Sequence, residues 1–146
     1  NSNIQTIEKD AFSKSDIEEI FIPPSVTEIC EKAFYECKNL RKVNIPTNSN
    51  LKTIESKSFS HTNIKDFFIS SKVSKISKFA FSISHNKKPK IIRIIQISEE
   101  SELKSFPFSA FIKNDDSINI KNDDSIVMIP STLRRLVSEA FELYKK

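Results

Sequence analysis

The chain has 146 residues, of which 38% are hydrophobic and 29% charged, so it can bury a core and is not a disordered polymer. Its formal net charge is +4 with both signs interleaved, and no basic stripe or known module is present, which argues against nucleic-acid binding. No apolar run approaches the roughly 20 residues of a membrane span.

The first twelve residues read as the back half of a repeat. Ile4, Ile7 and the pair at 11–12 show the same spacing as the apolar residues at 26–34. No signal peptide is visible, and the chain begins at Asn1 instead of Met. We therefore expect a fragment or a processed product of a longer array.

The stretch 17–34, IEEIFIPPSVTEICEKAF, is the pattern that most of the chain repeats. Counting from Ile22, further apolar residues follow at +4, +7 and +12. Copies begin at Ile22, Ile45, Ile69, Ile97 and Ile129, and those from Ile45 and Ile97 widen the first gap by two residues. A period in the low twenties, held through five copies, predicts one solenoid of stacked coils over residues 1–146.

A phenylalanine recurs at one position of the pattern, five residues after an aliphatic or aromatic residue. The six copies are Phe12, Phe34, Phe59, Phe81, Phe111 and Phe141. The residue before the phenylalanine is Ala in five copies and Ser58 in the other. This order of small and large residues predicts a layered core in which the rings stack from coil to coil.

Short alternating segments, ended by proline in three copies, predict five parallel strands. They span 19–22, 42–45, 66–69, 94–97 and 126–129, and at about 4.8 Å per strand they form one sheet about 20 Å wide. Apolar residues at three- and four-residue steps from Ala33 to Leu40 predict a helix of one or two turns. The rest of the return path is expected to be turns, with room for a second short strand. Because glycine is absent, we expect Asn and Asp at turn positions that need a positive φ.

Two insertions interrupt the array, near residues 82–91 and 113–124. The first includes ISHNKKPK, and the second lies in a tandem octad, KNDDSINI followed by KNDDSIVM. The first octad is either an added excursion or a competing register for the last strand. Both insertions are expected to form loops on one face of the solenoid.

Residues 20–26, IFIPPSV, and 33–40, AFYECKNL, show the repeat most fully. The pattern resembles the leucine-rich repeat of the BspA type and covers the chain apart from the insertions. The chain departs from the family pattern at Cys30 and Ser77, where the family has glycine, and in its long last coil. The resemblance implies an α/β solenoid, a leucine-rich-repeat array with a concave parallel β-sheet and short helical or turn segments on the return path.

The resemblance also implies a function, because proteins of this family are commonly surface or secreted proteins of bacteria and protists, implicated in adhesion. It implies a non-catalytic module that binds a protein partner, such as a host or extracellular protein, at a cell surface. The alternative is a cytoplasmic scaffold or regulator that uses the same surface. A signal peptide or membrane anchor in the full-length gene would favour the first over the second.

Solenoids commonly bind through the outward positions of the sheet. These positions form two rows across the coils: Glu19, Lys42, Asp66, Ile94 and Ile126, then Phe21, Asn44, Phe68, Gln96 and Met128. Apolar residues beside charged ones are typical of a protein-contact surface, with aromatic side chains as anchors. Alternatively, an insertion covers this face, or β propensity alone selected these residues.

Catalytic and metal-binding patterns are absent from the sequence. His61 and His85 are predicted to be solvated loop residues without a Cys or Ser motif beside them. The acidic runs 114–116 and 122–124 lack the ligand spacing of an EF-hand. Cys30 and Cys37 do not have a metal-site spacing, and Cys37 is predicted to be a thiol tucked into a turn. We therefore expect no enzymatic activity, no cofactor and no metal.

Overall fold

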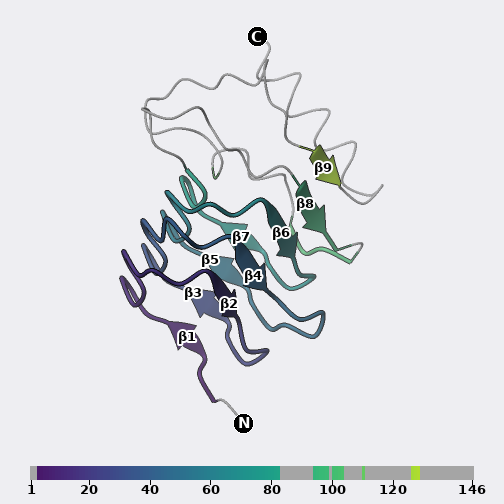
Figure 1. Cartoon of the computed structure of the whole chain (residues 1–146). Coiled ribbons are helices and arrows are strands. Elements are labelled where there is room, and N and C mark those ends of the chain that lie inside the picture. Colours follow the sequence, from purple (N-terminus) through teal and green to yellow (C-terminus); the bar gives the residue numbers. More distant parts are fainter. Residues whose placement is uncertain (1–2, 83–93, 99, 104–109, 111–125, 129–146) are drawn as a thin grey trace.

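The computed structural model describes residues 3–82, 94–98, 100–103, 110 and 126–128. Short parallel strands are stacked in chain order and lie in two rows (Figure 1). One row is a four-stranded sheet of two-residue strands: β1 (Thr6–Ile7), β3 (Glu28–Ile29), β5 (Thr53–Ile54) and β7 (Lys75–Ile76). These are the second short strands for which the sequence left room.

The other row contains the five strands that the alternation predicted. They are β2 (Glu19–Phe21), β4 (Lys42–Asn44), β6 (Asp66–Ile69), β8 (Ile94–Ile97) and β9 (Ile126–Met128). All their pairings are parallel, as expected. The predicted single sheet is instead two, β2–β4 and β6–β8–β9, because β4 and β6 are in contact without forming a hydrogen-bonded ladder.

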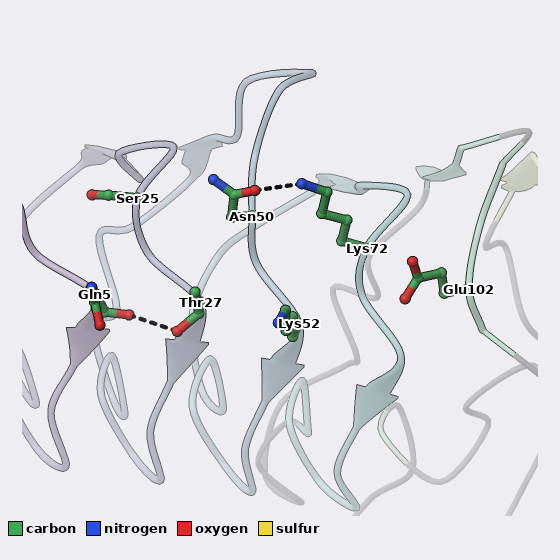
Figure 2. Close-up of a pocket in the computed structure, with 7 residues that line it drawn as sticks. All are labelled: Gln5, Ser25, Thr27, Asn50, Lys52, Lys72 and Glu102. Carbon is green, nitrogen blue, oxygen red and sulfur yellow. Dashed lines mark hydrogen bonds between the residues drawn. The ribbon is translucent and has the colours of Figure 1, made fainter.

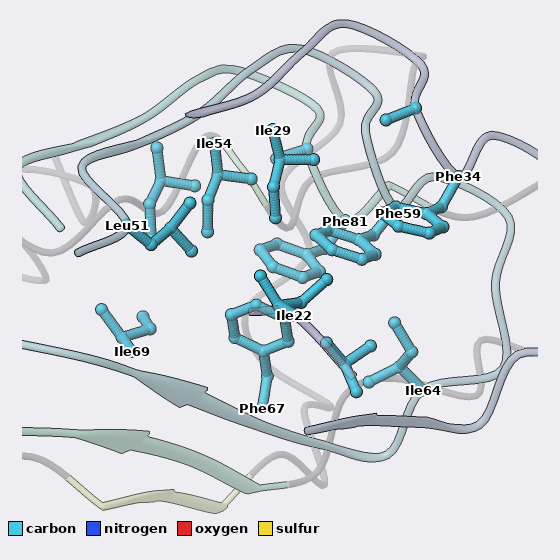
Figure 3. Packing of buried hydrophobic residues seen from close by; sticks show 14 of the residues in the cluster. Ile22, Ile29, Phe34, Leu51, Ile54, Phe59, Ile64, Phe67, Ile69 and Phe81 are labelled. Carbon is cyan, nitrogen blue, oxygen red and sulfur yellow. The ribbon is translucent and has the colours of Figure 1, made fainter. Parts of the chain in front are cut away.

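A row of stacked phenylalanine rings forms the centre of the core (Figure 3). The ring centroids of Phe34 and Phe59 lie 5.0 Å apart, and their planes differ by 5°. Phe12 continues the row at 5.2 Å from Phe34, and Phe81 at 5.4 Å from Phe59. The predicted ladder is therefore confirmed for the first four copies, while the last two, Phe111 and Phe141, lie outside the described residues.

One further ring in the core was not anticipated. Phe67, on β6, occupies the inward position that Ile20 and Val43 hold in the preceding coils, and it is 3% exposed. Its ring meets Phe59 and Phe81 edge-on, at centroid distances of 5.4 and 4.8 Å. The large side chain of Phe67 thus connects β6 to the stacked phenylalanine rings. This happens in the coil where hydrogen-bonded strand pairing is interrupted, between β4 and β6.

The helix expected from Ala33 onward is not formed, and the described residues contain no α-helix. Residues 31–36 form consecutive turns. The N–H of Ala33 donates to the carbonyl of Cys30, whereas the N–H of Phe34 donates to Ser58 of the next coil at 2.7 Å. Every second amide of this segment donates to a carbonyl of the next coil, so it cannot also donate to the carbonyl four residues earlier, as an α-helix requires.

Positive φ angles recur on both sides of the ladder residues. They occur at Asp10, Lys14, Lys32, Glu36, Lys57, His61 and Phe79. The expectation that Asn and Asp would fill such positions is wrong except at Asp10. The positions lie two residues before or after a ladder phenylalanine, so the repeat geometry imposes them on whatever side chain is present, at about 1 kcal/mol or more each.

Several parts of the sequence-based description fall outside the described residues. The insertions near 82–91 and 113–124 lie outside them, apart from Ser82. Ser82 is buried, and its backbone carbonyl accepts a hydrogen bond from His61 N–H. Within the described ranges, no helix has the length and apolarity that crossing a bilayer requires.

Candidate functional site

The outward positions of β2, β4 and β6 form a continuous surface that we call the strand face. It comprises Glu19, Phe21, Lys42, Asn44, Asp66 and Phe68. The residues between them point inward, with Val43 and Phe67 buried and Ile20 packed against the core. The alternation expected from the sequence is therefore present on these strands.

The backbone registers align the two predicted rows. Glu19 pairs with Lys42, and Phe21 with Asn44. Across β6, β8 and β9, Asp66 aligns with Ile94 and Ile126, while Phe68 aligns with Gln96 and Met128. The side chains of the last four residues lie outside what the structure describes, and a binding role for the rows stays a prediction.

A polar network holds one end of the strand face in place. The amide Nδ2 of Asn44 donates to Glu19 Oε1 at 2.6 Å, and Lys42 Nζ lies 3.5 Å from the same oxygen. The hydrogen bond from Asn44, and then the charge of Lys42, lower the pKa of Glu19 below its ordinary value. These contacts join adjacent coils and orient the side chains around Phe21.

Phe21 is the most exposed large apolar side chain among the described residues, at 56%. It belongs to the second predicted row. In that row, Asn44 takes the same position in the next coil, and the half-buried Phe68 takes it in the coil after that. The charged row of Glu19, Lys42 and Asp66 is exposed along its side. An aromatic anchor beside ordered charges is a usual composition for a protein-contact patch.

A second candidate site is an open polar hollow of about 660 Å³ at the edge where each coil enters the four-stranded sheet (Figure 2). It is lined by Gln5, Ser25, Thr27, Asn50, Lys52, Lys72 and Glu102. We call it the polar hollow. Sequence reasoning missed it, although the repeat held a signal. Each of these polar residues stands directly before or after one apolar position of the repeat, which is occupied by Ile4, Val26, Leu51, Val73 and Leu103.

His61 differs from the predicted solvated loop residue. It is half-buried, its ring lies edge-on to Tyr35 at 5.4 Å, and its Nδ1 is buried without a hydrogen-bond partner among the described residues. Burial lowers its pKa, opposed by the nearby charge of Glu36. Its ring therefore packs against the neighbouring coil, and no hydroxyl or thiol of the described residues forms a hydrogen bond with its Nδ1.

The two cysteines differ in burial, and the thiol of Cys37 is tucked into the core side of the coil, in agreement with its predicted enclosure. Cys37 is fully buried, and its Sγ donates to the Phe12 carbonyl of the preceding coil at 2.9 Å. Cys30 is partly exposed, and burial together with the carboxylates of Glu28, Glu8 and Glu55 raises the pKa of its thiol. Both thiols are free, and no group of three metal-ligating side chains is found in the described part of the chain.

Comparisons with known proteins agree with this architecture. The crystal structure of the pneumococcal vaccine antigen PcpA is similar, with a TM-score of 0.58 and 23% sequence identity. The match covers 68% of this chain and 25% of that one, and at this identity it shows the fold alone. A search of curated proteins finds no significant match. The model of the BspA type leucine rich repeat region matches six copies across residues 5–145, and the chain therefore belongs to the BspA-type leucine-rich repeat family.

Proposed function

We propose that the chain is a protein-binding module that acts through the strand face and has no catalytic chemistry of its own. The observation that carries this proposal is the exposure of Phe21, 56%, beside the Glu19–Asn44–Lys42 network. An aromatic ring on a rigid strand can be buried by a partner at little entropic cost, because its neighbours are already ordered. The surrounding charges would then select the partner by complementarity.

The proposed location is a cell surface or the extracellular space, where the partner would be a host or extracellular protein. Two comparisons support this: membership of the BspA-type family, and similarity in fold to a protein described as a vaccine antigen. The strand face would be the concave side of the array, as in leucine-rich repeats generally. The insertions near 82–91 and 113–124 would add variable loops to the recognition surface.

The test is binding of the purified chain to an immobilised panel of extracellular-matrix and serum proteins. The Phe21→Ser/Phe68→Ser double variant should lose captured partners while its melting temperature stays nearly unchanged. Phe79→Asn is the matched control, because it removes a partly exposed ring from the turn side, and Asn tolerates the positive φ there.

Retention of every partner by the double variant, or an equal loss in the Phe79→Asn control, would contradict a role for the strand face. Loss of the fold in the double variant would show that these rings are core residues, contrary to the exposure of Phe21. Any robust turnover in a substrate panel would contradict the absence of catalysis.

A further inference from the structure

The polar hollow is separate from the strand face and has a distinct composition. Its lining contains two amides, two hydroxyls, two lysines and one carboxylate, with no aromatic or large aliphatic residue. Such a surface offers nothing for an apolar anchor, unlike the region around Phe21. Its ligand must therefore be recognised through hydrogen bonds and charge.

The cations of the hollow are not neutralised by carboxylates in the described part of the chain. The ion pairs found there use Lys9, Arg41, Lys42 and Lys75. Lys72 Nζ instead donates to Asn50 Oδ1 at 2.5 Å, which leaves two of its three protons available. Lys52, in the same hollow, is exposed, and the described residues give its ammonium no carboxylate within ion-pair distance.

The hydroxyls of the hollow have already committed their protons. Ser25 Oγ donates to the Ile4 carbonyl at 2.6 Å, and Thr27 Oγ1 donates to the Gln5 carbonyl at 3.2 Å. Their oxygens are therefore left as acceptors for hydrogen-bond donors of a ligand. Asn50 uses one Nδ2 proton on the Pro24 carbonyl and keeps the other.

We propose that the polar hollow binds an acidic glycan, a chain that carries both hydroxyl groups and carboxylate or sulfate groups. Its anionic groups would lie between Lys52 and Lys72, on the Asn50 side of Lys72 and away from the Glu102 carboxylate (Figure 2). Its hydroxyls would donate to Ser25 and Thr27, and accept from Asn50. An ionised acidic side chain of a peptide has acceptors only, so it satisfies the lysines but not the hydroxyls.

The shape of the hollow favours a polymer over a compact ligand. Its lining residues come from successive coils, and the contacts between them, such as Lys72 with Asn50, cross from one coil to the next. Equivalent residues of adjacent coils are spaced by about 4.8 Å, so the hollow offers its polar groups at regular intervals along the stack. A repeating saccharide can use several of these groups at once.

The proposal is tested by titrating the purified chain with heparin, polygalacturonate, neutral dextran and poly-glutamate, using calorimetry at physiological salt. Heparin and polygalacturonate should bind and dextran should not. The Lys52→Gln/Lys72→Gln variant should bind about tenfold more weakly or worse, since it loses the charge-assisted contacts. The Lys14→Gln/Lys38→Gln control removes the same charge from exposed lysines outside the hollow and should change affinity by less than about twofold.

The proposal is overturned if neither acidic glycan binds, or if the two lysine variants lose affinity equally, because binding would then follow net charge alone. Poly-glutamate binding as tight as polygalacturonate would also overturn it and would assign the hollow to acidic peptides. The Phe21→Ser/Phe68→Ser variant should keep full glycan affinity, so failure of this proposal is distinguishable from failure of the strand-face function.

Discussion

Phe34 and Phe59 stack face to face across neighbouring coils, with centroids 5.0 Å apart and planes 5° from parallel. Each ring is almost completely excluded from solvent. The same residue position that fills the core thus also sets the spacing between coils. The strand face and the polar hollow both depend on that spacing, because each is built from equivalent residues of successive coils.

Deleting a ring inside the ladder should be costly. We expect Phe34→Ala to lower the free energy of unfolding by about 3–5 kcal/mol, as for other buried phenylalanines. Phe12→Ala should cost less, because Phe12 is 37% exposed and the described residues place a ring on one side of it only. Urea unfolding of both variants measures the difference, and equal losses would contradict the order of burial.

Relieving a left-handed backbone position should stabilise the chain. Lys57 has φ of 57°, a conformation that Gly adopts without the steric cost of a Cβ. We expect Lys57→Gly to raise the free energy of unfolding, by up to about 1 kcal/mol once the greater entropy of the unfolded glycine is subtracted.

The matched control for Lys57→Gly is Lys52→Gly, at a lysine without a positive φ. There the substitution should destabilise by about 0.5–1 kcal/mol, because only the entropic term operates. Thermal and urea unfolding of both variants would test the pair. A loss of stability in Lys57→Gly as large as that in Lys52→Gly would argue against backbone strain at this turn.

The pKa of Glu19 reports on the polar network of the strand face. Asn44→Ala should raise the pKa of Glu19 toward its ordinary value, because the hydrogen bond from Asn44 is the main cause of its lowering. Lys42→Gln should also raise it, through loss of the positive charge. An NMR titration of the carboxyl carbon measures both changes.

The sign of the pH effect follows from the direction of this shift. With a folded pKa below the unfolded one, the contribution of Glu19 to stability is present above the ordinary carboxyl range and is lost as the pH falls through the folded pKa. A Glu19 pKa that is the same in wild type and in Asn44→Ala would show that this contact does not persist in solution.

His61 should make the fold sensitive to mild acid. Burial lowers its pKa from the ordinary 6.5, so below about pH 6.5 the unfolded chain binds a proton more readily than the folded chain. Stability should therefore fall as the pH drops below that value, and less so in His61→Asn, where Asn fits the positive φ. Urea unfolding at about pH 8 and about pH 5 compares the two slopes, and identical slopes would rule out this role.

The sequence predicted the coil and its ladder because these depend on spacing. Phe12 and Phe34 are 22 residues apart, and the apolar positions between them keep the same order in every copy. The strand starts at Glu19, Lys42 and Asp66 followed from alternation alone. Features that follow from the repeated spacing of residue types could therefore be predicted from the sequence.

Other features depend on where individual hydrogen bonds go, and the pattern does not record that. The three- and four-residue steps after Ala33 fit a helix, yet every second amide in this segment donates to a carbonyl of the next coil, and the amides between them close turns. The sequence predicts a solvated His61, whereas the ring of Tyr35 in the neighbouring coil covers part of it, and the spacing of the repeat does not reveal that contact. The polar hollow was missed because its residues share a place in the repeat but differ in type.

Contacts between the ladder rings in solution provide the decisive measurement. In a chain labelled selectively at phenylalanine, inter-ring nuclear Overhauser effects should connect Phe12 with Phe34, Phe34 with Phe59, and Phe59 with Phe81, in that order. Phe67 should show cross-peaks to both Phe59 and Phe81. Cross-peaks that skip a coil, such as Phe12 to Phe59, or an absence of inter-ring contacts in the folded chain, would show that the coils do not stack through their phenylalanines.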